Sequence, residues 1–214
     1  MKIRIFLADD QTVLRDGLRS LLEADPDLAV VGEAGNGSDA VREIERLQPD
    51  VAVLDISMPE RNGIDAAEIV RGRCPKTKVV MLSVDSGAES IQRAFQAGAA
   101  GYLLKFSAGR EVAQAVRAVH LGKRYLSDQI TGIVVEGYGR EPREKSPLSS
   151  LSRRERQILQ LLAEGRSAPE IAKLLSLSPR TVETYRARMM EKLGIKDFRE
   201  LVMYAVKHGI VNSE

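Results

Sequence analysis

The first 125 residues alternate between short apolar runs and longer stretches in which apolar residues recur every three or four positions. The short runs predict buried strands at 3–8, 29–34, 78–83 and 101–105, and in the run that ends at Asp55. The longer stretches have the period of amphipathic helices. Strands separated by helices pair in parallel, and the helices then cover both faces of the sheet. The sequence therefore predicts an α/β fold with a doubly wound, five-stranded parallel sheet.

Polar residues stand where the predicted strands end. These residues are Asp9, Asp10, Asp55, Ser83 and Lys105. The carboxyl ends of parallel strands meet at one edge of a sheet, and ligands of open α/β sheets bind at that edge, so we expect the five side chains to converge. Taken singly, each residue is explained as surface charge or packing, but that explanation does not account for their shared position.

Three carboxylates that converge repel one another and require a cation. A hard divalent ion such as Mg²⁺ suits Asp9, Asp10 and Asp55, because it binds one or two carboxylates and keeps waters that a phosphate can replace. The Asp55 carboxylate is then able to attack a phosphoryl group. Lys105 offers a compact positive charge to a phosphoryl oxygen, and Ser83 offers a hydrogen bond. This pattern favours phosphoryl transfer to Asp55, a reaction in which positioning and charge neutralisation dominate.

A second domain is predicted after residue 150. Residues 136–150 place Gly, Pro and Ser among charges and lack an apolar period, which is typical of a linker. We therefore divide the chain into a domain of residues 1–125, a linker of residues 126–150 and a domain of residues 151–214. The last domain has 12 basic and 8 acidic residues, a net charge of +4, whereas the rest of the chain has a net charge of −2. Nucleic acid is a candidate partner for the basic domain.

The last 64 residues are predicted to form an all-α domain of four helices. Their start and stop signals are Ser152-x-x-Glu155, Ser167-x-x-Glu170, Ser178-Pro179, Asp197-x-x-Glu200, Gly165, Gly194 and Gly209. A tight turn at 176–178 joins the second helix to the third, which predicts a helix-turn-helix.

The third of these helices has two distinct faces. The predicted packing pairs Val182, Met189 and Leu193 of this helix with Ile171, Leu174 and Leu175 of the second. The opposite face is able to enter the major groove of DNA. The alternative for that face is a solvated surface of mixed charge.

Features of a membrane or secreted protein are missing from the sequence. No stretch reaches ~18 uninterrupted apolar residues, so no membrane span is expected. The pair Asp9-Asp10 follows the first apolar run too soon for a signal peptide. Cys74 is the only cysteine, which excludes an internal disulfide and fits a reducing compartment. We therefore expect a cytoplasmic protein with no membrane partner.

Both halves of the chain resemble known families. Residues 1–125 resemble the flavodoxin-like receiver domain of bacterial response regulators, through Asp9-Asp10, Asp55, the loop from Met58-Pro59 to Gly63, Ser83, Tyr102 and Lys105. The last domain resembles the LuxR-type helix-turn-helix, through Leu151-Ser152-x-x-Glu155, Glu170-Ile171-Ala172, Ser178-x-x-Thr181-Val182 and Lys192-Leu193. The whole chain is therefore similar to the response regulators of the NarL/FixJ family.

The receiver resemblance implies a role for each residue of the acidic pocket. Asp55 becomes the phosphorylation site, and a sensor histidine kinase or a small acyl phosphate becomes the donor. Asp10, Asp55 and the backbone carbonyl of Ser57 become Mg²⁺ ligands, with Asp9 in support.

Two further receiver residues are implied to transmit the signal. Ser83 and Tyr102 form a switch pair that moves inward when Asp55 is phosphorylated. Asp85 stands at a variable position beside this pair, and we hypothesise that it helps to orient a hydrolytic water.

The helix-turn-helix resemblance implies contacts with double-stranded operator DNA. Residues near the bases are Glu183, Thr184, Ala187 and Arg188, and residues near the phosphate backbone are Thr181, Tyr185, Arg186 and Lys192. Arg180 lies on the same exposed face and is also expected to contact DNA. The fourth helix resembles the part that makes dimer contacts, and a homodimer is expected when the protein is phosphorylated.

The sequence thus predicts a transcription regulator that is activated by phosphorylation of Asp55 and is not an enzyme. One alternative is a DNA-binding regulator whose receiver is inert. The other is a regulator that uses its receiver to sequester partner proteins.

Overall fold

A computed structural model describes residues 2–132 and 147–211 of the chain. These residues belong to two compact units, and each unit is described by itself. Among the described residues, no helix combines the length and apolar character that crossing a bilayer requires.

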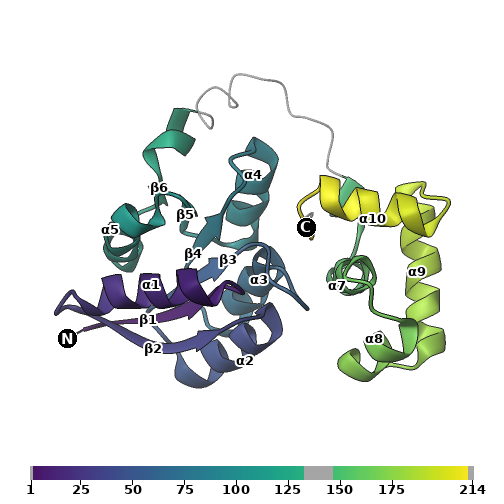
Figure 1. The fold of residues 1–214 in the computed structure, drawn as a ribbon, viewed down its shortest axis with the longest axis horizontal. Helices are drawn as coiled ribbons and strands as arrows, with labels where there is room; N and C mark the ends of the chain where they lie inside the picture. Colours follow the sequence, from purple (N-terminus) through teal and green to yellow (C-terminus); the bar gives the residue numbers. More distant parts are fainter. Residues whose placement is uncertain (1, 133–146, 212–214) are drawn as a thin grey trace. The chain divides into compact units, whose positions relative to one another are not determined.

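The first unit is a parallel sheet with strands in the order β2-β1-β3-β4-β5-β6 (Figure 1). The strands are β1 (Ile3–Ala8), β2 (Leu28–Ala34), β3 (Val51–Asp55), β4 (Lys78–Ser83), β5 (Gly101–Leu104) and β6 (Tyr125–Leu126). The helices between them are α1 (Thr12–Glu23), α2 (Gly37–Leu47), α3 (Gly63–Arg73), α4 (Ala88–Ala97) and α5 (Ala108–His120). The predicted fold class is confirmed, with a sixth strand added.

The sheet has one hydrophobic core on each face, because successive strand residues point to opposite faces. In β1, Phe6 and Ala8 belong to the core beneath α2, α3 and α4. Ile5 and Leu7 belong to the core beneath α1 and α5. This double burial explains why the strands read as continuous apolar runs rather than as alternating ones.

The folded part of the first unit extends beyond residue 125, where the sequence had suggested its end. Tyr125 and Leu126 pair with β5, and Ile130 is completely buried in the core under α4. Of the expected linker 126–150, residues 133–146 lie outside the described part. Leu148, near its other end, is 2% exposed and belongs to the core of the second unit.

The second unit is a cluster of four α-helices, as predicted, preceded by a short 3₁₀ turn, η1 (Pro147–Ser150). The helices are α7 (Arg153–Ala163), α8 (Ala168–Leu175), α9 (Pro179–Leu193) and α10 (Phe198–Lys207). The predicted capping box at Ser152 forms, and Ser178 and Asp197 cap the helices that follow them. Gly194 ends α9 with a φ of 67°, a backbone conformation that favours glycine.

The buried face of α9 is the predicted one. Val182 and Met189 are fully buried, and Ile171 lies in the same core. The expected contact of Leu174 is wrong, because this side chain is 47% exposed. Leu175 follows Ile171 by one helical turn and is partly buried, whereas Leu174 falls at the edge of that face.

Candidate functional site

The carboxyl edge of the parallel sheet brings the predicted polar residues together. Asp9 and Lys105 directly follow β1 and β5, and Asp55 is the last residue of β3. The Lys105 ammonium nitrogen lies 2.9 Å from Asp9 Oδ2 and 2.9 Å from Asp55 Oδ2. Residues that are about 50 positions apart in sequence therefore meet because parallel strands end at one edge.

This edge contains a cluster of three carboxylates. Asp9, Asp10 and Asp55 each offer one oxygen, and these oxygens lie within 4.8 Å of one another. Apart from the Lys105 ammonium, the buried Oδ2 atoms of Asp9 and Asp55 have no hydrogen-bond donor within residues 2–132 and 147–211. Asp9 and Asp55 are 1% exposed, whereas Asp10 faces solvent. Two buried carboxylate oxygens that share a single cation within the described residues, beside an open carboxylate, suit a hard divalent cation that keeps part of its water shell.

Burial governs the electrostatics of the pocket. Burial raises the pKa of Asp55 from its ordinary value of 3.8 to about 6. The charge of Asp9 acts in the same direction, whereas Lys105 and the N–H of Ser57 oppose the shift. For Lys105, burial favours the neutral amine, but the charges of Asp55 and Asp9 outweigh burial and raise the pKa. Lys105 is therefore a lasting positive charge beside a carboxylate that is costly to ionise.

In metal-free solution at pH 7, Asp55→Asn should stabilise the fold by about 2 to 3 kcal/mol. The folded protein holds the Asp55 proton more tightly than the unfolded chain does. The stability that this proton provides is complete below pH 3.8 and is lost as the pH rises to about 6. Urea unfolding with a chelator, at pH 4.5 and pH 7.5, should show a larger gain at the higher pH. An equal gain at both values would contradict the raised pKa.

Ser83, Asp85 and Tyr102 form a hydrogen-bonded group at the end of β4. Ser83 Oγ accepts a bond of 2.9 Å from the backbone N–H of Asp85, and the Tyr102 hydroxyl donates to the Asp85 carbonyl at 2.8 Å. Tyr102 is fully buried, and this burial raises its pKa. The Asp85 carboxylate accepts from the Gly87 N–H at 2.7 Å and from the Ser90 hydroxyl, both at the start of α4. Both oxygens of Asp85 thus bind the α4 terminus, an arrangement unlike the hypothesised role of orienting a water.

Three further residues shape the pocket, and the sequence pattern had singled out only one of them, Gly63, as the end of the loop after β3. The Arg15 guanidinium donates to the carbonyl of Asp9 at 2.7 Å, and no local pattern indicates this contact. Asn62 caps α3 by accepting from the Asp65 N–H at 2.9 Å, which the Asn-x-x-Asp spacing could have predicted. Gly63 begins α3 so close to β3 that a Cβ atom would lie 2.1 Å from the carbonyl oxygen of Asp55.

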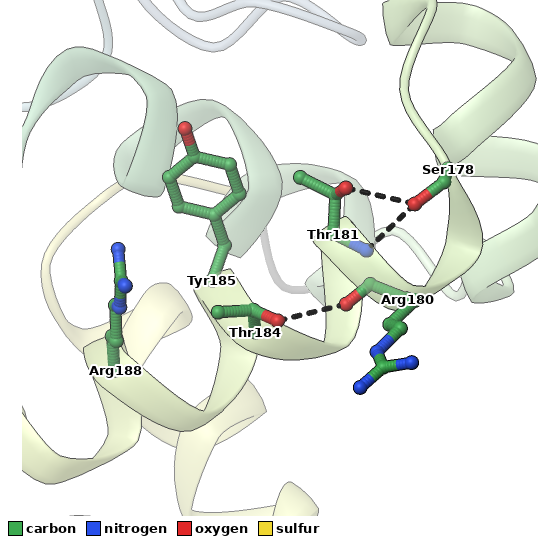
Figure 2. A pocket seen from close by; sticks show the side chains of 6 residues that line it. All are labelled: Ser178, Arg180, Thr181, Thr184, Tyr185 and Arg188. Carbon is green, nitrogen blue, oxygen red and sulfur yellow. Dashed lines mark hydrogen bonds between the residues drawn. The ribbon is translucent and has the colours of Figure 1, made fainter.

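A second candidate site lies on α9 of the helical unit. A hollow of about 370 Å³ opens along the exposed side of the helix. Figure 2 shows its lining residues, which are Ser178, Arg180, Thr181, Thr184, Tyr185 and Arg188. Ser178 Oγ accepts from the Thr181 N–H at 3.1 Å and lies 2.8 Å from Thr181 Oγ1. The hollow therefore runs from the N-terminus of α9 to its middle, and the positive end of the helix dipole favours anions near its start.

The other predicted DNA-binding residues of α9 lie in different surroundings. Glu183 and Ala187 are exposed, and Glu183 Oε2 lies 3.6 Å from Arg186 Nη1. Arg186 also stacks on the Phe198 ring, 5.5 Å from the ring centroid. Lys192 Nζ binds both carboxylate oxygens of Glu155 at 2.8 Å. The predicted set is therefore divided, because Arg186 and Lys192 contact other side chains of the helical unit.

Each of the two units contains a match to a known protein family. Residues 5–117 match the response regulator receiver domain, and residues 149–205 match the bacterial regulatory proteins of the luxR family. Response regulator UvrY of Escherichia coli (strain K12) is 38% identical over 212 residues, which cover 99% of this chain and 97% of UvrY.

Two further relatives extend the comparison. The DNA-binding transcriptional activator DevR/DosR of Mycobacterium tuberculosis (strain H37Rv) is 36% identical over 205 residues, which cover 96% of this chain and 94% of that protein. The structure of the two-component response regulator RcsB–DNA complex is 25% identical, with a TM-score of 0.60, over 95% of this chain and 98% of that chain. This chain therefore belongs to the two-component response regulators of the NarL/FixJ type, a family of DNA-binding transcriptional regulators and not of enzymes.

Proposed function

We propose that phosphorylation of Asp55 by a sensor histidine kinase controls sequence-specific DNA binding by this response regulator. The observation that carries the proposal is the pairing of the buried Asp55 carboxylate with Lys105 at 2.9 Å, beside Asp9 and Asp10. This arrangement supplies a nucleophile, a fixed positive charge and an acidic metal site at one sheet edge.

Each pocket residue has a defined task in the proposed reaction. An Asp55 oxygen attacks phosphorus and forms an acyl phosphate, while the bond from phosphorus to the donor atom breaks and the donor leaves. Lys105 balances the charge of the phosphoryl oxygens, and Ser83 donates a hydrogen bond to one of them. Asp10, Asp55 and the Ser57 carbonyl, with Asp9 in support, would hold Mg²⁺, whose positive charge would offset the negative charge of the incoming group.

The hydrogen-bonded group at the end of β4 supports a route for the signal. We propose that Ser83 turns toward the phosphoryl group and that Tyr102 follows as its switch partner. Asp85 connects both residues to the first turn of α4 through the bonds described above. The phosphorylated protein then shifts its population toward a form with a changed α4 surface.

The output of this shift is binding to double-stranded operator DNA by α9. We propose that a linker within the predicted range 126–150 joins the receiver to the DNA-binding domain, and that the phosphorylated chain acts as a homodimer in the cytoplasm. A two-fold dimer would bind half-sites about one helical turn apart, ~10–10.5 bp. The hollow on α9 and the similarity to a regulator solved with DNA support this proposal.

Footprinting tests the whole proposal. The chain is incubated with Mg²⁺ and acetyl phosphate, or with Mg²⁺ alone, and is then offered DNA that carries its own promoter region. We expect protection of two adjacent half-sites at a protein concentration at least about tenfold lower after phosphorylation, a coupling of the usual allosteric size. Equal protection in both samples would support an inert receiver, and no protection in either would support a regulator that sequesters proteins.

A further inference from the structure

The four cationic side chains of α9 fall into two groups by what they touch. Arg186 stacks on Phe198 of α10 and lies 3.6 Å from Glu183. Lys192 binds the side chain of Glu155, which is 4% exposed and also accepts from the Ser152 N–H at 2.7 Å. Burial disfavours the Glu155 charge, but the bonds from Lys192 and Ser152 outweigh burial and lower its pKa. Both cations therefore hold α9 against neighbouring helices.

Arg180 and Arg188 form the second group. Both side chains are exposed, and neither has an ion pair or a side-chain hydrogen bond within the described ranges 2–132 and 147–211. Both line the hollow on α9, and Figure 2 shows Arg188 extending to the same side of the helix as Tyr185. A guanidinium with no protein partner keeps its whole donor fork available for a ligand.

Thr184 lies one helical turn before Arg188 on the same exposed face. Its hydroxyl donates to the Arg180 carbonyl at 2.9 Å, as Figure 2 shows. The hydroxyl is thus used within the helix, and the methyl group is the part of Thr184 that remains for the hollow. Thr181 differs, because both its N–H and its hydroxyl take part in the cap with Ser178.

We propose that Thr184 and Arg188 determine the DNA sequence that this protein selects, whereas Arg186 and Lys192 contribute no base preference. The Thr184 methyl contacts the C5-methyl of a thymine, and the Arg188 fork donates to O6 and N7 of a guanine. Four residues of helix rise span about 6 Å, so both side chains can reach base edges within one major groove, which is about 12 Å wide. Each half-site therefore carries a thymine contact and a guanine contact. This inference rests on the proposed function, in which α9 enters a major groove.

The test combines variants of the chain with variants of the DNA. The phosphorylated chain first selects its site from a random double-stranded library. A set of variant sites is then made, each with a single change. One thymine is replaced by deoxyuridine, which removes one methyl group, or one guanine is replaced by 7-deazaguanine, which removes one N7 acceptor. One deoxyuridine should weaken wild-type binding about fourfold, and one 7-deazaguanine about 5- to 100-fold.

Each of these two drops in affinity should be absent from one protein variant and present in the other. Thr184→Ser should bind the thymine and deoxyuridine sites equally, and Arg188→Ala should be indifferent to 7-deazaguanine. As matched controls, Arg186→Ala and Lys192→Ala should keep the wild-type base preference. Lys192→Ala should also lower the melting temperature by a few degrees, because it removes the cation that is paired with the buried Glu155 carboxylate.

The outcomes separate the inference from the proposed function. Suppose that wild-type protein selects a site, but that deoxyuridine and 7-deazaguanine still weaken the binding of both Thr184→Ser and Arg188→Ala. The inference is then overturned while the proposed function stands. A changed base preference in the Arg186 or Lys192 variant would also overturn it. If wild-type protein selects no sequence at all, the proposed function fails and the inference fails with it.

Discussion

Asp55→Ala should abolish Mg²⁺-dependent labelling of the chain by acetyl phosphate. The variant keeps Lys105, Asp9 and Asp10 but has no carboxylate at the end of β3 to attack phosphorus. Without a nucleophile no acyl phosphate forms, so the expected loss is complete rather than partial. Incubation with labelled acetyl phosphate, followed by peptide mapping, measures the incorporation and its position.

A matched control for this variant is Asp16→Ala. Asp16 is an exposed residue of α1, so its removal takes away one carboxylate outside the pocket. Labelling of Asp16→Ala should equal that of the wild type. Label that persisted in Asp55→Ala would move the phosphoacceptor to another residue, and mapping would identify it.

Gly63→Ala should destabilise the receiver by about 3 kcal/mol and slow labelling of Asp55 by about 100-fold. The added Cβ would lie 2.1 Å from the Asp55 carbonyl oxygen and 3.0 Å from Met81 Cε. The carbonyl is backbone and is unable to rotate away, so the end of β3 or the start of α3 has to move. A displacement there changes the orientation of the Asp55 carboxylate in the pocket. Thermal unfolding measures the first effect, and the rate of labelling by acetyl phosphate measures the second.

Gly72→Ala provides the control within the same helix. Apart from its chain neighbours and the backbone of its own helix, no atom of the described residues lies within 4 Å of the position that its Cβ would take. Alanine is favoured over glycine in a helix, so this variant should gain up to about 1 kcal/mol and be labelled at the wild-type rate. Equal stability of the two variants would show that the close approach of Gly63 to β3 does not affect the free energy of unfolding.

Much of the acidic pocket was predictable because it depends on topology. Alternating periods predict parallel strands, and parallel strands place residues that follow β1, β3 and β5 at one edge. Asp9, Asp55 and Lys105 could therefore be grouped from their positions alone. In the structure, the Lys105 ammonium nitrogen lies 2.9 Å from a carboxylate oxygen of each aspartate. The contact of Arg15 with the Asp9 carbonyl could not be predicted in this way, because it depends on where α1 packs on the sheet.

The end of the first unit shows a second limit. Tyr125 and Leu126 form a strand of only two residues, too short for any period to be detected. They become a strand because the free edge of β5 offers unpaired backbone groups to them. Because no strand period was detectable at residues 125–126, the sequence predicted five strands and a linker that starts at residue 126.

The sequence alone determined the two fold classes, the caps of the helical domain and the set of residues at the strand ends. These features depend on local periods, cap residues and topology, which neighbouring residues encode. Only the tertiary structure decided which cations of α9 remain available. Arg180, Arg186, Arg188 and Lys192 look alike in the sequence, but Phe198 and Glu155 bind two of them from other helices. The proximity of Gly63 to Asp55 was decided in the same way, because contacts between elements depend on how packed helices and strands bring distant residues together.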